Sequence, residues 1–224
     1  MATERTYGDG CAIAHGLDLV GERWALLVVR ELLLGPKRFT DLKRGLPNAG
    51  ANIISGRLRE LERAGVVKRD RLPPPAGARV YRLTGWGREL EGTVMSLGRW
   101  AARSPSQPRD APIGADSIAL ALRERFDPDA ARRLRAGYEL RLGEDRFRIT
   151  VSNDEIDVAR GSIDQPDARI DTDPGTLAAV LWNDRPLADA QRAGEIRIEG
   201  DQAAVERLVR LFPMPEPAAA DAAA

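Results

Sequence analysis

The sequence holds few of the residues that build disulfide, metal and catalytic sites. Of its 224 residues, one is a cysteine, Cys11, and one is a histidine, His15. A single cysteine excludes an internal disulfide and fits a reducing cytosol, so we expect a cytoplasmic protein. A single histidine leaves little for a histidine-based metal site or a histidine general base, and we expect no metal and no cofactor.

Long hydrophobic runs are absent as well. No window approaches the roughly 18 consecutive apolar residues that a membrane helix needs, so we expect no membrane partner. The first residues, MATERTYGDG, have no apolar segment after a basic one and are not expected to be a secretory signal. With 43% apolar and 30% charged residues, the chain has the composition of a folded protein.

Charge is distributed unevenly, although the whole chain is neutral. Residues 1–104 carry 18 Lys and Arg against 11 Asp and Glu, whereas residues 105–224 carry 16 against 23. Between Lys37 and Arg82 there are 12 basic and 4 acidic residues. This asymmetry predicts two domains with different partners, of which the basic one suits a polyanion.

A break in composition separates the two halves. The segment SPSQPRDAPIG, residues 104–114, is rich in proline and small polar residues, as linkers are. The end of the chain, PMPEPAAADAAA, has no apolar period and is predicted to be a disordered tail. We therefore expect a first domain over 1–104, a linker over 105–115, a second domain over 116–214 and a tail over 215–224.

The elements predicted in the first domain follow the order of a winged helix-turn-helix. Ile13, Leu17 and Val20 have helical spacing, and GERWALLVVRELLLGP predicts a second helix that Gly35 and Pro36 end. A short helix follows in FTDLKRGLP, with Thr40 as its expected cap. A longer helix begins at about Gly50 and closes at Gly65, and the strands VVKRDRL and RVYRLT then flank the turn PPPAGA.

The longer helix has two distinct faces. Ile54, Leu58 and Leu61 share one face, and short polar residues and arginines lie on the other. A helix of about 10–12 Å diameter fits the major groove of DNA, where short polar side chains meet base edges and arginines meet phosphates. The alternative is a solvated helix whose arginines only pair with Glu60 and Glu62. The basic hairpin that follows favours DNA, with its tip reaching a neighbouring minor groove.

The segment GWGRELEGTVMSLGRWAARS predicts one more helix. Leu90, Val94, Leu97 and Ala101 share a face that Trp100 flanks. This face either completes the core of the domain or forms a dimer interface. DNA-binding proteins of this kind commonly pair to match two half-sites, so we expect a homodimer.

Four ordered motifs resemble the HxlR-type regulators, which are relatives of the MarR family: CAIAHGLDLVGERWALL, GPKRFTDL, RLRELERAGVVKR and YRLTGWGREL. The resemblance implies a homodimeric bacterial transcription regulator with a winged helix-turn-helix that binds double-stranded DNA. This sequence has Gly50 where such helices often carry a capping serine or threonine, so the first contact offers no hydroxyl. The expected DNA-binding residues are Lys37, Arg38, Asn52, Ser55, Gly56, Arg57, Arg59, Lys68, Arg69, Arg71, Arg79 and Arg82.

Cys11 is a redox candidate. Some HxlR-type regulators sense electrophiles or oxidants through a cysteine near the N-terminus, and Cys11 matches that position. A reactive thiolate needs a nearby cation or helix N-terminus, and Cys11 is expected to begin the first helix. The formaldehyde-sensing member has a lysine two residues after its cysteine, where this chain has Ile13. The alternative is a small, partly buried apolar residue near a dimer interface.

The second half predicts an α+β layer. ALALRERF and DPDAARRLRAG predict helices, the latter capped by Asp127, and YELRLGEDRFRITVSNDEIDVARG alternates as an antiparallel meander. ARIDT and GEIRIEG predict strands, and DPGTLAAVLW and GDQAAVERLVRLF predict helices on one side of the sheet.

Two segments, ARIDTDPGTLAAVL and AGEIRIEGDQAAVERLVRLF, resemble those of a sterol-carrier-protein-type lipid-binding domain. The resemblance covers about Asp116 to Phe212. The resemblance implies a tunnel between sheet and helices for a fatty, sterol-like or polyketide-like guest. The alternative is that the apolar residues only fill the core. The candidate ligand-binding residues are Phe147, Ile149, Val158, Leu181, Trp182, Leu208 and Phe212.

We expect no catalysis, because the second half has neither histidine nor cysteine and no glycine-rich phosphate loop. Its acidic pairs lie at predicted turns. The chain is thus predicted to be a homodimeric transcription regulator in which a hydrophobic effector shifts the dimer between spacings that match or miss the half-sites. Three alternatives remain: a second domain that only mediates dimer or partner contacts, a thiol-based regulator, and a lipid carrier with vestigial DNA binding.

Overall fold

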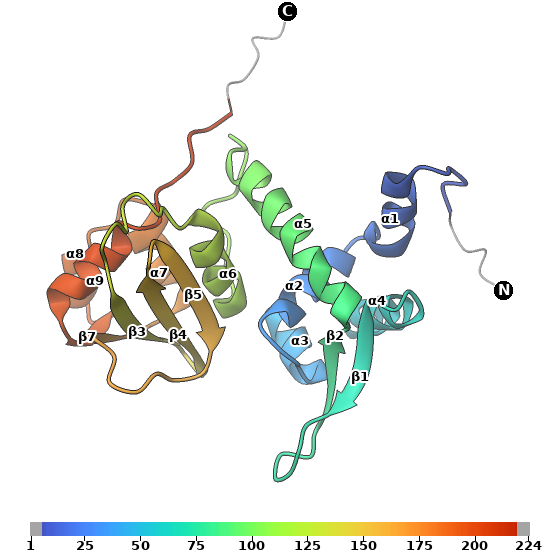
Figure 1. Cartoon of the computed structure of the whole chain (residues 1–224), viewed down its shortest axis with the longest axis horizontal. Coiled ribbons are helices and arrows are strands. Elements are labelled where there is room, and N and C mark those ends of the chain that lie inside the picture. Colours follow the sequence, from blue (N-terminus) through green and yellow to red (C-terminus); the bar gives the residue numbers. More distant parts are fainter. Residues whose placement is uncertain (1–5, 219–224) are drawn as a thin grey trace, which may run out of the picture. The chain divides into compact units, whose positions relative to one another are not determined.

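The computed structural model of the chain describes residues 6–218 and divides into two compact units at Val94 and Met95. Figure 1 shows the order of the helices and strands along the chain. The predicted fold class is confirmed: a winged helix-turn-helix unit precedes an α+β unit of sheet and helices. The domain boundaries expected at residues 104 and 116 stay predictions.

The first unit contains helices followed by a β-hairpin. Its helices are α1 (Ala12–Val20), α2 (Ala25–Leu33), α3 (Phe39–Gly45) and α4 (Ala51–Arg63), and its two strands are β1 (Val67–Arg71) and β2 (Arg79–Leu83). Of these helices, α2, α3 and α4 form its core. The strands pair antiparallel, with Val67 opposite Leu83 and Arg71 opposite Arg79. α5 (Gly85–Ala102) begins in this unit and continues across its boundary.

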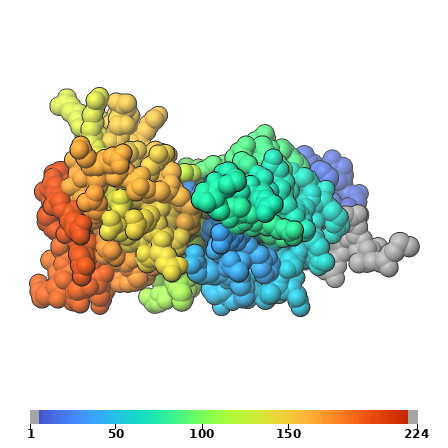
Figure 2. Space-filling model, turned by 90° about the horizontal axis from the view of Figure 1, so that it is seen from below, coloured from blue at the N-terminus to red at the C-terminus, as the bar shows by residue number. Residues whose placement is uncertain are grey.

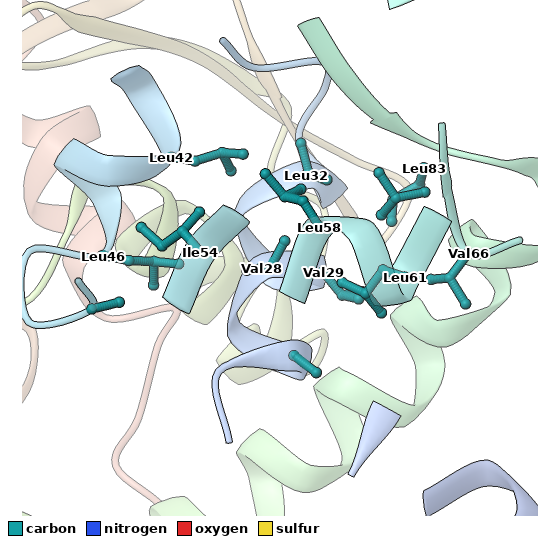
Figure 3. Packing of buried hydrophobic residues seen from close by; sticks show 13 residues of the cluster. Val28, Val29, Leu32, Leu42, Leu46, Ile54, Leu58, Leu61, Val66 and Leu83 are labelled. Carbon is teal, nitrogen blue, oxygen red and sulfur yellow. The ribbon is translucent and has the colours of Figure 1, made fainter. Parts of the chain in front are cut away.

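The core of this unit lies between α2, α3, α4 and the base of the hairpin. Ile54, Leu58 and Leu61 of α4 are buried, as their spacing predicts. They pack against Val28 and other aliphatic residues of α2 and α3 (Figure 3). Burying a side chain of this size contributes about 1.5–3 kcal/mol relative to exposure. Because this face of α4 packs on the core, the opposite face is exposed to solvent.

Two of the helix boundaries predicted in this unit differ from the structure. α2 begins at Ala25 rather than near Gly21, because Trp24 before it has a left-handed backbone, with φ of 77°. α3 begins at Phe39, so Thr40 lies inside the helix and is not its cap. The carboxylate of Asp41 instead accepts a hydrogen bond from the backbone N–H of Arg38 at 3.1 Å. Gly65 closes the α4 turn with φ of 74°, a region that glycine adopts without strain.

The second unit is a five-stranded mixed sheet with helices. The strands follow the spatial order β5-β4-β3-β6-β7, and β3 pairs with β6 in parallel while the other pairs are antiparallel. The strands are β3 (Ala136–Leu142), β4 (Asp145–Ser152), β5 (Glu155–Arg160), β6 (Ala168–Thr172) and β7 (Arg197–Gly200), and the helices are α6 (Ala115–Arg125), α7 (Pro174–Trp182), α8 (Leu187–Arg192) and α9 (Gln202–Val209).

The helices of this unit cover one face of the sheet. Leu122 of α6, Leu177 of α7, Leu187 of α8 and Leu208 of α9 all line one small cavity together with Ile149 of the sheet. The expected layer arrangement is therefore confirmed. The outer face carries charged residues, and one of them, Glu139, is buried and pairs with Arg141 at 2.7 Å.

The helix predicted at DPDAARRLRAG is wrong. Residues 128–133 form turns rather than a helix. The Asp127 carboxylate accepts hydrogen bonds from the backbone N–H groups of Asp129 and Ala130, as a helix cap would, but Arg133 has a left-handed backbone with φ of 63°, which a right-handed helix does not include. Of the predicted tail, residues 215–218 are irregular and the Ala218 N–H donates to the Arg103 carbonyl at 2.8 Å. Residues 219–224 of that tail lie outside the described residues.

Candidate nucleic-acid interface and ligand-binding site

The outer face of α4 presents short polar residues and one unpaired arginine. Asn52 and Arg59 are exposed, and Ser55 and Gly56 lie between them with intermediate exposure. Within residues 6–218, no acidic side chain forms an ion pair with Arg59. No atom lies within 4 Å of a Cβ added at Gly56, so this face is open at its middle. The face predicted to meet base edges is therefore solvent-facing and sterically clear.

The β1–β2 hairpin, which we call the wing, carries a second group of cations. Figure 2, seen from the side to which the wing points in Figure 1, shows the teal wing tip at the surface. Arg71 and Arg79 face each other across the two strands near the tip and are exposed. The Arg71 Nε donates to the Gly77 carbonyl at 2.8 Å, which stabilises the turn. Among the described residues, Lys68 and Arg79 form no ion pair.

Two other cations of the wing are partly neutralised. Arg69 pairs with Glu62 at 2.9 Å and lies over the Tyr81 ring, and Arg82 pairs with Asp70 at 2.8 Å. The hydrogen bond from Arg82 lowers the pKa of Asp70, with a further contribution from the Arg71 backbone N–H. Exposed pairs of this kind exchange readily, because each contributes about 0–1 kcal/mol. Arg69 and Arg82 therefore remain available to a polyanion.

Two of the predicted DNA contacts have carboxylate partners within the unit. Lys37 is buried, and its ammonium lies 2.5 Å from Glu31, so its charge is directed into the fold. The side chain of Arg57 is 20% exposed and pairs with Glu60 at 2.6 Å and with Glu22, before α2, at 3.4 Å. Their role at DNA stays a prediction.

The Lys37 pair belongs to a buried network beneath the helix-turn-helix. Glu31 on α2 is 2% exposed and also accepts a hydrogen bond from Arg30 at 2.7 Å. Burial raises the pKa of Glu31, but the charges and hydrogen bonds of Lys37 and Arg30 outweigh it and hold that pKa below its ordinary value. The Lys37 backbone exchanges hydrogen bonds with Tyr81 of β2 at 2.9 and 2.8 Å. This network ties α2 to the base of the wing.

Cys11 occupies the N-cap position of α1 and is exposed. The backbone N–H groups of Ala14 and Ile13 lower the pKa of the thiol, although the side chain forms no capping hydrogen bond. The expectation that Cys11 begins the first helix is confirmed. Within a single chain Cys11 lies on the surface, and the alternative of a residue partly buried near a dimer interface stays a prediction.

Apolar side chains near both ends of the first unit are exposed. Ile13 is 75% and Leu17 46% exposed on α1, and Trp86 is 52% exposed at the start of α5. Leu90 and Val94 of α5 pack against the core, whereas Leu97 and Trp100 further along that helix are 46% and 75% exposed. A groove of about 160 Å³ lies between α1 and α5 in the first unit, with Gly16 on one wall and Trp86 on the other. Sequence periodicity does not reveal it, because it requires the packing of α1 beside α5.

The second unit contains an apolar cavity of about 20 Å³ between sheet and helices. Of the predicted ligand-binding residues, Ile149, Leu181, Leu208 and Phe212 line it. A cavity of this size holds about one water molecule. The interior is thus nearly filled by its own side chains, and a hydrocarbon guest requires its walls to separate.

Three predicted lining residues lie elsewhere in the core. Phe147 is fully buried beneath the Arg160 guanidinium, 5.1 Å from the ring centroid. Val158 is buried on β5, and Trp182 lies under the Arg125 guanidinium at 4.4 Å. The apolar pattern of the sequence places these three residues inside the unit, but it does not show which part of the interior contains a cavity.

Neither a metal centre nor a membrane helix is found within residues 6–218. No group of three or more His, Cys, Asp and Glu side chains in that range is arranged to hold a metal ion. None of the helices formed by those residues is both long enough and apolar enough to span a bilayer.

Comparison with known proteins identifies both halves. The description "HxlR-like helix-turn-helix" matches residues 19–108, and "Sterol carrier protein domain" matches residues 139–220. The uncharacterized HTH-type transcriptional regulator YvaP of Bacillus subtilis is 39% identical over 85 residues, which are 38% of this chain and 79% of that protein.

Two solved structures are similar to parts of the chain. The reduced form of the transcriptional regulator YodB from B. subtilis is 30% identical, with a TM-score of 0.38, and the match covers 45% of this chain and 98% of that one. The sec-alkylsulfatase Pisa1 from Pseudomonas sp. is 19% identical, with a TM-score of 0.41, and covers 46% of this chain and 16% of that one. From the YvaP match and the two domain matches, the chain belongs to the HxlR-type helix-turn-helix transcriptional regulators and carries a sterol carrier protein domain after its helix-turn-helix.

Proposed function

We propose that α4 enters the major groove of operator DNA while the wing contacts the adjacent backbone. The single observation that carries the proposal is the clear outer face of α4 beside an exposed, cationic wing. Asn52, Ser55 and Gly56 are short enough to let the helix approach base edges, and Arg59 lies one turn further along. Arg38, Lys68, Arg69, Arg71, Arg79 and Arg82 are assigned to phosphates, and Lys37 and Arg57 are left out of the set.

Salt dependence separates the two kinds of contact. Each phosphate contact contributes about 0.9 to the slope of log affinity against log salt, so Arg79→Ala should reduce that slope by about 1. Loss of a base contact at Asn52 should cost about 1–3 kcal/mol on the selected duplex and much less on unrelated duplexes. Fluorescence anisotropy with a duplex selected from a random library measures both quantities.

A matched control tests whether the arginine position matters. Arg146→Ala removes an exposed arginine from β4 in the second unit and should leave affinity and salt slope unchanged. If Arg79→Ala and Arg146→Ala change the slope equally, only overall charge is read and the wing assignment fails.

We propose that the protein acts as a homodimer through the exposed apolar residues of α1 and α5. Ile13, Leu17 and Trp86 are exposed apolar side chains on the two helices that flank the groove between α1 and α5, and exposed apolar surface commonly marks interfaces. Analytical ultracentrifugation should give a dimer for the native chain and a monomer for Leu17→Asp. A monomeric native chain at micromolar concentration would contradict the proposal.

We propose that the second unit binds a hydrophobic effector, and we assign it no catalytic role. The support is an all-aliphatic and aromatic lining shared by α6, α7, α8, α9 and the sheet. Because the cavity is small, binding must select or induce a state in which the walls have separated. A ligand that binds this state better shifts the equilibrium, and a coupling of about 1–3 kcal/mol is usual. If no apolar ligand changes operator affinity, the unit is a dimer or partner module instead.

A thiol-based response is a second candidate because Cys11 is exposed at a helix N-cap, where backbone N–H groups lower its pKa. A helix N-terminus stabilises the thiolate, which is the reactive form. Operator affinity measured before and after treatment with a quinone should fall in the native protein and stay constant in Cys11→Ser. An equal response in both proteins would remove this candidate.

A further inference from the structure

Three buried hydrogen-bond donors in the second unit have no acceptor among the described residues. One is the Nε of Arg169 on β6, and the other two are the Nε1 of Trp182, a residue that is 8% exposed, and the Nε of Arg125. Trp182 and Arg125 lie together, because the Arg125 guanidinium carbon is 4.4 Å from the centroid of the Trp182 ring. Unpaired buried donors are rare in native proteins, since each forfeits a hydrogen bond that water would supply.

The charge of Arg125 is also poorly compensated. Within residues 6–218 no carboxylate forms an ion pair with it, and its Nη1 contacts only the sulfur of Met214, at 3.1 Å. The adjacent Glu124 turns toward α5, where its Oε2 lies 3.4 Å from a Cβ placed on Gly98. Burial lowers the pKa of Arg125, attraction by Glu124 opposes that effect, and repulsion by Arg109 adds to it. The surroundings therefore hold a cation that lacks an oxygen acceptor.

The same three chain segments build this cluster and the apolar cavity. On α6, Leu122 lines the cavity and Arg125 follows one turn later. On α7, Leu181 lines the cavity and Trp182 is the next residue. After α9, Phe212 lines the cavity and Met214 contacts Arg125. Arg125, Trp182 and Met214 do not line the cavity themselves, but each follows a lining residue by one to three positions, so the same segments carry the cluster and the cavity wall.

We propose that Arg125 and the Trp182 indole N–H form the head-group subsite for an apolar monocarboxylate whose hydrocarbon part enters the cavity. A guanidinium binds a carboxylate through two parallel N–H···O bonds, and the indole N–H supplies one more donor. A neutral guest such as a sterol leaves the charge uncompensated, and a cationic guest is repelled. The inference rests on the proposed effector function of the second unit and narrows it to anionic ligands.

Probes of matched chain length test the head group. Calorimetric titration of the full-length protein with dodecanoate, dodecanol and dodecylammonium measures the three affinities. Dodecanoate should bind at least about 10-fold more tightly than dodecanol, as expected for a charge-assisted pair, and dodecylammonium should bind most weakly. On adding dodecanoate, the indole N–H resonance of Trp182, assigned by its loss in Trp182→Phe, should shift.

Variants of Arg125 and Trp182 test whether these two residues cause the preference for dodecanoate over dodecanol. Arg125→Gln should reduce the ratio of dodecanoate to dodecanol affinity to about 1, and Arg125→Lys should keep part of it because the charge remains without the planar fork. Trp182→Phe keeps the aromatic ring and should weaken only dodecanoate. Arg210→Gln, an exposed arginine after α9, is the control and should leave the ratio unchanged.

The outcomes separate the subsite from the effector function. If none of the three probes binds the native protein, the effector function and this inference both fail. If dodecanoate and dodecanol bind with equal affinity, the unit takes apolar guests but the subsite is refuted. Should Arg125→Gln fail to fold, two other measurements decide: a native affinity ratio in Trp182→Phe, or a Trp182 resonance that dodecanoate does not shift in the native protein, overturns the proposal.

Discussion

Replacing Lys37 with methionine tests the buried network beneath the helix-turn-helix. Lys37→Met keeps an unbranched side chain, one heavy atom shorter, and removes the ammonium that lies 2.5 Å from Glu31. Breaking a buried ion pair by removing one partner costs about 3–5 kcal/mol. Arg30 still pairs with Glu31 at 2.7 Å, so we expect the lower end, about 3 kcal/mol. For a domain of this size the thermal midpoint should fall by roughly 12–24 °C.

The assay is calorimetry of the full chain, with hydrogen exchange in α2 and β2 identifying the transition of the first unit. The double variant Glu31→Leu with Lys37→Met removes both charges and should lie within about 1 kcal/mol of the native protein, because an apolar pair often replaces a buried ion pair without loss. If Lys37→Met costs less than about 0.5 kcal/mol, or if the double variant is as unstable as the single one, the reasoning is refuted.

The pH dependence of Lys37→Met has a defined sign. In the native fold the pKa of Glu31 is lowered, so its contribution to stability is present above the unfolded pKa of about 4.3 and is lost as pH falls through the folded pKa. Without Lys37, burial dominates and the folded pKa rises, so the charged carboxylate destabilises the fold at neutral pH. The difference between the two proteins should therefore shrink in acid. After correction for the folded fraction, the variant should keep the native DNA salt slope, since Lys37 faces inward.

Three further changes have defined outcomes. Gly45→Ala should destabilise the first unit, because the added Cβ lies 2.0 Å from a carboxylate oxygen of Glu31. Gly56→Ala meets no atom within 4 Å and should stabilise α4 by about 0.5–1 kcal/mol. Thermal unfolding of both variants measures these effects. Burial raises the pKa of Tyr138 to about 12, so the native protein should lose up to about 2–3 kcal/mol of unfolding free energy as pH rises from 10 to 12. Tyr138→Phe should lack this loss. Chemical denaturation at several pH values measures it. The rate of Cys11 alkylation by iodoacetamide should reach half its maximum below the ordinary thiol pKa of about 8.5, and a midpoint at or above that value contradicts the backbone stabilisation.

Local sequence patterns predicted the elements whose signals are short-range. The spacing of Ile54, Leu58 and Leu61 predicted α4 and its buried face, and a proline-rich turn between basic strands predicted the wing. α8 was missed because six residues are too few to show a helical period. The helix predicted after Asp127 was wrong because Arg133 has a left-handed backbone that interrupts it, and local spacing does not reveal that conformation.

Contacts between residues distant in sequence determine how the site residues are oriented, and the sequence alone did not reveal these contacts. Lys37 was placed at the DNA because the chain around it is basic, but its partner Glu31 lies on another helix and turns it inward. Trp182 was placed in a tunnel by its apolar character, yet its ring packs under Arg125. The parallel pairing of β3 with β6 joins segments that are distant in sequence, and no local period encodes that choice.

If the second unit binds an effector as proposed, a nearly closed cavity suits that role better than lipid transport. When the binding-competent state is a minor one, the apparent affinity falls by the fraction of molecules in that state, so a weakly interacting apolar molecule does not trigger the response. A guest that also satisfies Arg125 and Trp182 adds interactions which the closed state lacks, and only such differential binding shifts the equilibrium. α5 begins in the first unit and ends in the second. Selectivity for the effector and its effect on DNA binding would then have the same origin: the free energy needed to separate the walls of the cavity.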